Sequence, residues 1–286
     1  MTGQRRYQMV VLDLDGTLLL PDGSLTPRTI KAVNEVAKAG YRLCLATGRN
    51  HTESRSHLEK LGIKTECVFV GGAMIIDTNT GKTLHRTTMH PQVAADACRI
   101  LESLGHAAMA LQDTCETGLD YLISRDLPIR PASERWMAAM KMAIEYVPDL
   151  ADFHHRHTLR VGICAESAEM EPIVTLLQKH FGDRAMVHRL RVPGANCEVL
   201  EVFDPAVSKW EGISFVIRRH KIDANRVIAV GDDMNDLHMI EHSGLGVAMG
   251  NARPELKEVA DRVIGKNTED GLAQFLGELL DGKLEA

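Results

Sequence analysis

Two carboxylates stand one residue apart at the end of a short apolar run near the start of the chain. Met9–Leu12 has the composition of a strand buried on both faces of a parallel sheet, and Asp13 and Asp15 follow it. Ionised carboxylates are costly to bury without a counter-charge. Magnesium suits the pair best, because it prefers oxygen ligands and is commonly held by one or two carboxylates together with phosphate oxygens. The other interpretation is that Asp15 and Gly16 only form a turn.

Further polar groups follow or flank expected strands. Thr47 and Gly48 come after the apolar stretch 41–46, Asp232 comes after 227–230, and Lys209 opens an expected helix from Ser208 to about 220. The carboxyl ends of parallel strands share one edge of a sheet, and ligands bind there. We therefore expect these residues to meet. Taken singly, Thr47 is also explained as a helix cap and Lys209 as a solvated surface residue.

These residues resemble the motifs of the haloacid dehalogenase superfamily, and within it those of the Cof-type phosphatases with a large C2 cap. The four matches are Asp13-Leu14-Asp15-Gly16-Thr17 (DxDGT), Thr47-Gly48, Lys209, and Gly231-Asp232-Asp233-Met234-Asn235-Asp236 (GDxxND). The tail, from Gly244 to Asn251 and onward, is similar as well. The chain departs from the usual pattern at Gly71, where the family has Asn, and at Trp210, where it has Gly.

The resemblance implies a reaction and a role for each matching residue. Asp13 attacks phosphorus, and Asp15 protonates the leaving group and then activates water, so that phosphoryl transfer is split into two displacements. The remaining implied roles are magnesium binding by Asp13, Asp232 and the backbone carbonyl of Asp15, phosphate binding by Leu14, Thr47, Gly48, Lys209 and Asn235, and support of the metal shell by Asp236.

The order of expected elements predicts how these residues are positioned. Strands and helices alternate along the first 83 residues, which indicates a doubly wound parallel α/β sheet, a Rossmann-like core. We expect an inserted α+β cap at 84–192, with a Met- and Ala-rich helix over 133–146, and a return to the core at 193–286, with Pro193-Gly194 as the hinge and 199–203 as its first strand. A chain of 286 residues is long enough for such a core and insertion.

Composition excludes several classes of protein. A net charge of −6 gives no general basis for nucleic-acid binding, and no apolar run approaches the roughly 18 residues of a membrane span. The six cysteines lie far apart without a CxxC pair, and no secretory signal is evident, so we expect reduced thiols and a cytoplasmic protein. His154, His155 and His157 are better explained as a solvated or loosely packed cluster than as a zinc site.

The leading hypothesis is a magnesium-dependent phosphatase that acts on small phosphorylated metabolites, either sugar phosphates or cofactor phosphates. A phosphomutase or phosphonatase is a second possibility, although no lysine in the cap has the setting that a phosphonatase needs. A non-catalytic phosphate sensor is a third. A nucleotide-binding protein is disfavoured because neither GxGxxG nor GxxxxGK[ST] occurs. The substrate and the oligomeric state stay open.

Overall fold

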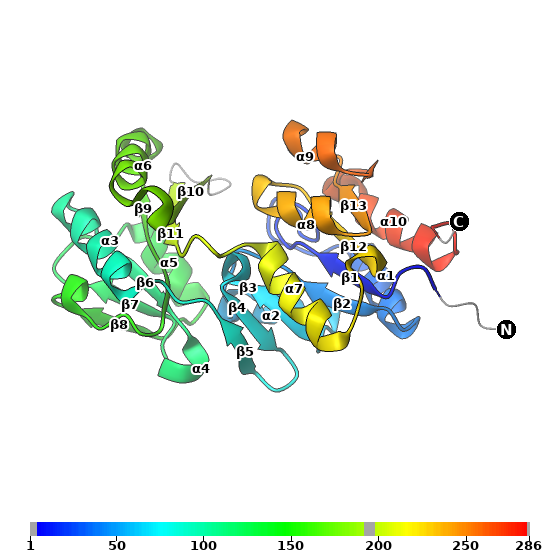
Figure 1. Cartoon of the computed structure of the whole chain (residues 1–286), viewed down its shortest axis with the longest axis horizontal. Helices are drawn as coiled ribbons and strands as arrows, with labels where there is room; N and C mark the ends of the chain where they lie inside the picture. Colours follow the sequence, from blue (N-terminus) through cyan, green and yellow to red (C-terminus); the bar gives the residue numbers. More distant parts are fainter. Residues whose placement is uncertain (1–4, 192–197, 285–286) are drawn as a thin grey trace. The chain divides into compact units, whose positions relative to one another are not determined.

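The computed structural model describes residues 5–191 and 198–284, which form two compact units (Figure 1). The first unit combines the chain up to Leu84 with the chain from Ser208 onward, and the second comprises His85–Val207. The chain thus returns to the first unit at Ser208, later than the expected position 193. The proposed hinge at 193–194 lies outside the described residues.

The first unit is built on a five-stranded parallel sheet with the order β14-β13-β12-β1-β2. Leu12 of β1 lies opposite Val230 of β12 on one side and Leu45 of β2 on the other, so these three strands end at the same level. All four residues of β1 are fully buried, as its apolar sequence predicts. The strands are β1 (Met9–Leu12), β2 (Arg42–Leu45), β12 (Val227–Gly231), β13 (Leu245–Ala248) and β14 (Arg262–Val263).

Helices of the first unit form two groups around this sheet (Figure 1): α1 packs against α2 and α10, and α7 packs against α8. The predicted start of α1 is confirmed, since the hydroxyl of Thr26 accepts a hydrogen bond from the amide of Thr29 and Pro27 occupies the first turn. This is the doubly wound α/β core expected from the sequence. The helices are α1 (Pro27–Lys38), α2 (His51–Leu61), α7 (Lys209–His220), α8 (Leu237–His242), α9 (Pro254–Val259) and α10 (Gly271–Leu280).

A small antiparallel sheet, β3-β4-β5, borders the parallel sheet. Its strands are β3 (Glu66–Phe69), β4 (Met74–Asp77) and β5 (Lys82–Arg86). The sequence predicted β3 as a third strand of the parallel sheet, but β3 meets the end of β2 only through the isolated bridge between Ala46 and Val68. Its regular pairing is antiparallel, with β4.

The second unit contains a six-stranded sheet with the order β10-β11-β9-β6-β7-β8. Buried side chains of α3 and α6 pack on it to form a separate hydrophobic core. The elements are α3 (Pro91–Ser103), β6 (Met109–Gln112), α4 (Thr114–Thr117), β7 (Tyr121–Ser124), α5 (Pro131–Ala139), β8 (Ile144–Val147), β9 (Thr158–Ala165), α6 (Ser167–Phe181), β10 (Met186–Arg191) and β11 (Glu198–Phe203).

Two expectations for this part of the chain are wrong. The strand expected at 199–203 was assigned to the parallel core, but β11 pairs antiparallel with both β9 and β10 and so belongs to the second unit. The helix expected over 133–146 ends at Ala139, and Ile144–Val147 forms β8 beside β7 instead. Within the described residues, no helix has the length and apolar character needed to cross a bilayer.

Candidate active site

The polar residues singled out from the sequence meet at the carboxyl edge of the parallel sheet. Asp13 directly follows β1, and its amide still donates to the carbonyl of Val230 on β12, at 3.0 Å. Asp232 is the first residue after β12. Because β1 and β12 end in register, the two carboxylates leave the sheet side by side. The parallel pairing of β1 with β12 therefore brings together two carboxylates that lie far apart in the sequence.

Lys209 joins two of these carboxylates. Its ammonium donates to Asp13 Oδ1 at 2.5 Å and to Asp236 Oδ1 at 2.6 Å, and all three side chains are buried. Ser208 caps α7 by accepting from the amide of Glu211, which fixes the first turn that carries Lys209. The alternative of a solvated surface lysine is wrong, since Lys209 is only 1% exposed.

The loop after β12 is organised by Asp236. Its second carboxylate oxygen, Oδ2, accepts from the backbone amides of Asp232 at 2.9 Å and Asp233 at 3.1 Å. Asp236 thus holds both the loop that presents Asp232 and the ammonium of Lys209. The support of a metal shell that the resemblance implies for Asp236 stays a prediction.

Asp232 is surrounded by groups whose role the sequence did not reveal. The hydroxyl of Thr17 donates to Asp232 Oδ1 at 3.3 Å, and the amide of Asn251 donates to Asp232 Oδ2 at 3.4 Å and to the carbonyl of Gly16 at 2.8 Å. Gly16 itself passes so close that a β-carbon there would lie 2.1 Å from Asp232 Oδ2. Thr17 lies in the DxDGT motif and Asn251 in the similar tail segment, so the resemblance could have indicated both as neighbours of Asp232.

Asp15 pairs with Arg49. The guanidinium donates from Nε to Asp15 Oδ2 at 2.8 Å and from Nη2 to Asp15 Oδ1 at 2.5 Å, a two-point ion pair. Asp15 is also the most exposed of the predicted carboxylates, with 55% of its side chain accessible. Arg49 was missed in the sequence, although it follows Thr47-Gly48 directly.

The remaining predicted phosphate ligands lie at the same edge. The amide of Thr47 donates to the carbonyl of Val68, and its buried hydroxyl accepts from the amide of Arg49. The residue that caps α2 is Asn50. The interpretation of Thr47 as a helix cap is therefore wrong. A β-carbon on Gly48 would lie 3.9 Å from the side-chain amide of Asn235, which places these two residues together.

Leu14 connects Asp13 and Asp15 and anchors the turn between them. Its side chain is fully buried, and its carbonyl accepts from the amides of Leu18 and Leu19. The assignment of its amide to a phosphate oxygen stays a prediction, as do the ligand roles of Thr47, Gly48 and Asn235.

Burial and mutual repulsion shift the ionisation of the cluster. Burial raises the pKa of Asp13 well above its ordinary value, and the neighbouring carboxylates add to this, while Lys209 opposes it. Burial, with Asp236 nearby, likewise raises the pKa of Asp232 to about 7. Burial alone would lower the pKa of Lys209, but Asp13 and Asp236 raise it overall, so the lysine stays charged.

The donor set fits a divalent cation. Asp13, Asp232 and Asp236 each offer a carboxylate oxygen within 4.8 Å of the others. When ionised they carry three negative charges, and Lys209 supplies only one positive charge. A hard dication with oxygen ligands would balance the excess at Asp13 and Asp232, where burial first and the neighbouring carboxylates second raise the pKa.

Both departures from the family pattern have a structural explanation. Gly71 has φ 64° and ψ 12°, a left-handed conformation that Asn tolerates and glycine adopts without strain, so the change preserves the backbone. Trp210 packs on α8, where its ring stacks on His242 with a centroid distance of 5.5 Å. Neither change removes a group from the cluster.

The expected solvated histidine cluster is not solvated throughout. His155 is fully buried, its Nε2–H donates to the carbonyl of Leu150 at 2.9 Å, and its Nδ1 lies 3.0 Å from the hydroxyl of Thr158. It is a hydrogen-bonded core residue of the second unit.

Together, the fold and this edge define the class of the protein. It is a doubly wound α/β protein with a large insertion, and its carboxyl edge carries an acidic, lysine-bridged cluster suited to a cation and an anionic ligand.

Comparison with known proteins identifies the family. The model of the haloacid dehalogenase-like hydrolases matches residues 10–276, and the chain belongs to this family. The chain is 29% identical over 282 residues to the pyridoxal phosphate phosphatase YbhA of Escherichia coli, covering 94% of this chain and 97% of that protein. It is 27% identical over 276 residues to the 5-amino-6-(5-phospho-D-ribitylamino)uracil phosphatase YitU of Bacillus subtilis, covering 94% and 96%.

Solved structures support the same fold. A haloacid dehalogenase-like hydrolase from Bacteroides thetaiotaomicron superimposes with a TM-score of 0.82 at 24% identity, over 96% of this chain and 99% of that one. These findings confirm the predicted superfamily and fold class, and they confirm that the chain is an enzyme, a hydrolase.

Proposed function

We propose that this hydrolase is a magnesium-dependent phosphatase that cleaves small phosphate monoesters through an aspartyl phosphate on Asp13. The observation that carries the proposal is the buried Lys209 bridge between Asp13 and Asp236, beside Asp232, at the carboxyl edge of the sheet. A buried cluster with excess negative charge is costly to maintain, and binding of a cation and a phosphoryl group would offset that cost.

Magnesium would be held by Asp13, Asp232 and the backbone carbonyl of Asp15. When bound, it supplies neutralising charge for the phosphoryl oxygens. Lys209 and Thr47, with the amides of Leu14 and Gly48 and the side chain of Asn235, would hold the remaining oxygens.

Lys209 would orient Asp13 for attack. Lys209 binds Oδ1, so the free oxygen, Oδ2, forms the new bond to phosphorus while the bond to the ester oxygen breaks. In the second step water attacks the phosphorus of the aspartyl phosphate, which releases inorganic phosphate and restores the carboxylate.

Asp15 manages the proton in both steps. It donates a proton to the departing ester oxygen and later accepts one from the attacking water. In this structure both of its oxygens accept hydrogen bonds from Arg49, so neither faces a substrate oxygen while this pair is intact. To act as an acid, Asp15 must therefore leave Arg49 and turn toward the substrate.

The relatives narrow the substrate class. YbhA and YitU are both named for small organic phosphates, one a pyridoxal phosphate and the other a phosphoribitylamino compound. We accordingly propose cofactor phosphates and sugar phosphates as substrates. We further propose a cytoplasmic location, because the five described cysteines are free thiols.

The test is phosphate release from an aryl phosphate, pyridoxal phosphate and a set of sugar phosphates, with magnesium and with a chelator. The parent should turn over only with magnesium, and Asp13→Asn should lose activity at least about 1,000-fold, since the nucleophile is removed. Asp233→Asn is a matched control, because this neighbouring carboxylate is half-exposed and pairs with Arg253 at 3.3 Å instead of joining the cluster.

Two outcomes would contradict the proposal. Equal activity in Asp13→Asn and the parent would remove Asp13 from the mechanism. Binding of phosphate by the parent without turnover of any ester would replace the phosphatase with a phosphate sensor.

A further inference from the structure

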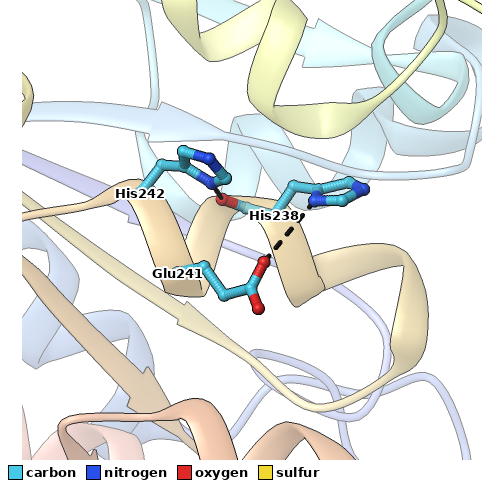
Figure 2. A group of neighbouring side chains, drawn as sticks. All are labelled: His238, Glu241 and His242. Carbon is cyan, nitrogen blue, oxygen red and sulfur yellow. Dashed lines mark hydrogen bonds and ion pairs between the residues drawn. The ribbon is translucent and has the colours of Figure 1, made fainter.

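A second group of metal-ligating side chains lies on α8, apart from the carboxylate cluster. Glu241 and His242 follow His238 by three and four residues, so each is a neighbour of His238 on the surface of the helix. One ligand atom of each lies within 4.8 Å of the others, and all three side chains are exposed. In Figure 2 the carboxylate of Glu241 reaches toward the ring of His238. Two imidazoles and a carboxylate are thus gathered on one short helix.

The ring of His242 is set in the tautomer that binds a metal through Nε2. Its Nδ1 lies 2.8 Å from the backbone carbonyl of His238 (Figure 2). A carbonyl oxygen can only accept, so Nδ1 carries the proton and the lone pair of the neutral ring lies on Nε2. Metal-binding histidines commonly hold their second nitrogen on a carbonyl in this way.

Trp210 restricts the same ring further. The indole, from α7, stacks on His242 with an interplanar angle of 26°. The stacked imidazole therefore has a defined plane as well as a defined tautomer, which reduces the ordering cost of binding a metal.

The other two side chains are close but do not satisfy each other. His238 Nδ1 and Glu241 Oε2 are 3.6 Å apart, within range of an ion pair but too far for a good hydrogen bond. Their side chains are 61% and 38% exposed, so both have room to rotate. Zinc bonds of about 2.0–2.2 Å place tetrahedral ligands roughly 3.3 Å apart, a contraction that rotation of exposed side chains can supply.

We propose that His238, Glu241 and His242 bind a transition-metal dication of the zinc and nickel class. Imidazole nitrogens favour these ions over magnesium, which prefers oxygen. Three protein ligands leave at least one position for water. The ion would link one turn of α8, the six-residue helix that begins directly after Asp236, and so stabilise the helix next to the catalytic loop.

Trp210 makes the site directly observable. The chain has two tryptophans, so Trp136→Phe leaves Trp210 as the only one. In this background, and with excess magnesium to occupy the carboxylate cluster, we expect Ni²⁺ to quench the fluorescence of Trp210 saturably. Zn²⁺, which does not quench, should reverse the effect by competition.

Two variants test the ligands. His238→Ala keeps the stack of Trp210 on His242 but removes one imidazole, and Glu241→Gln keeps the shape but removes the charge. Each should weaken Ni²⁺ binding by about tenfold or more, because even the loss of an outer-shell partner costs metal sites about 10- to 100-fold. His180→Ala, an exposed histidine on α6, should leave binding unchanged.

The proposal fails if Ni²⁺ does not quench Trp210 saturably in the parent. It also fails if His238→Ala and Glu241→Gln bind Ni²⁺ as the parent does, in which case quenching comes from another site. Circular dichroism of each variant without metal checks that α8 and the fold are retained.

Discussion

Replacement of Lys209 by methionine tests how the buried cluster is stabilised. Methionine keeps most of the apolar stem and removes the ammonium that binds Asp13 at 2.5 Å and Asp236 at 2.6 Å. The side chain is only 1% exposed, so water cannot readily replace the lost charge. We expect Lys209→Met to destabilise the first unit strongly when no divalent cation is present.

The magnitude follows from the charges left behind. Carboxylate oxygens of Asp13, Asp232 and Asp236 lie within 4.8 Å of one another. Two like charges at that distance repel by about 3 kcal/mol at an effective dielectric constant of about 20. Removal of one partner from a buried ion pair typically costs about 3–5 kcal/mol. Uptake of protons by the carboxylates limits the loss, so we expect about 3–4 kcal/mol, or about 6–16 °C in Tm for a unit of this size.

The assay is thermal unfolding at pH 8 in a chelator, followed by circular dichroism, and again with magnesium. Magnesium should reduce the difference in Tm between Lys209→Met and the parent, because the cation balances part of the negative charge that the lost ammonium no longer neutralises. Lys31→Met is the control: this lysine is 76% exposed, meets Glu35 at 3.7 Å, and should shift stability by less than about 1 kcal/mol. Each kcal/mol of unfolding free energy corresponds to a shift of about 2–4 °C in Tm. A Tm for Lys209→Met within 2 °C of the Lys31→Met value would therefore refute the reasoning.

Two further predictions concern backbone and pH. Gly16→Ala would place a β-carbon 2.1 Å from Asp232 Oδ2 at φ +80°, so we expect loss of magnesium-induced stabilisation and an activity loss of about 100-fold. The control is Gly23→Ala, which has a similar φ of +78° but open space around it and should affect neither property. Equal effects of the two variants would show that backbone strain alone is responsible. Burial lowers the pKa of His155, so below pH 6.5 the unfolded chain binds more protons than the folded one and the second unit loses stability as the pH falls. In a Trp210→Phe background, where fluorescence reports Trp136 of the second unit, urea unfolding should show that His155→Gln loses less stability than its parent between pH 7.5 and 5.5. Parallel stability curves would contradict this.

Local patterns in the sequence were sufficient for much of the core. The apolar run before Asp13, the Thr26-Pro27 start of α1 and the run before Asp232 depend on neighbours a few residues away, and each forms the predicted element. Strong periodicity and capping chemistry act locally, so they can be read without knowing the fold.

Strand partners could not be read in the same way. A mostly apolar run such as 199–203 suits either sheet, because apolar side chains can be buried beside parallel or antiparallel neighbours. Pairing with β9 and β10, decided by contacts distant in sequence, places this strand in the second unit. Similarly, Ile144–Val147 continued a helical pattern, but β7 offered an open strand edge beside which it extends.

The candidate site shows the same contrast between local sequence patterns and contacts distant in sequence. By itself the sequence singled out the candidate groups, because Asp13, Asp15, Lys209 and Asp232 lie in motifs whose order and spacing are specific. Only the tertiary structure decided how those groups are paired: Lys209 bridges Asp13 and Asp236, and Arg49 pairs with Asp15. Such pairings join residues up to about two hundred positions apart, and they arise because parallel strands end in register at one edge of the sheet.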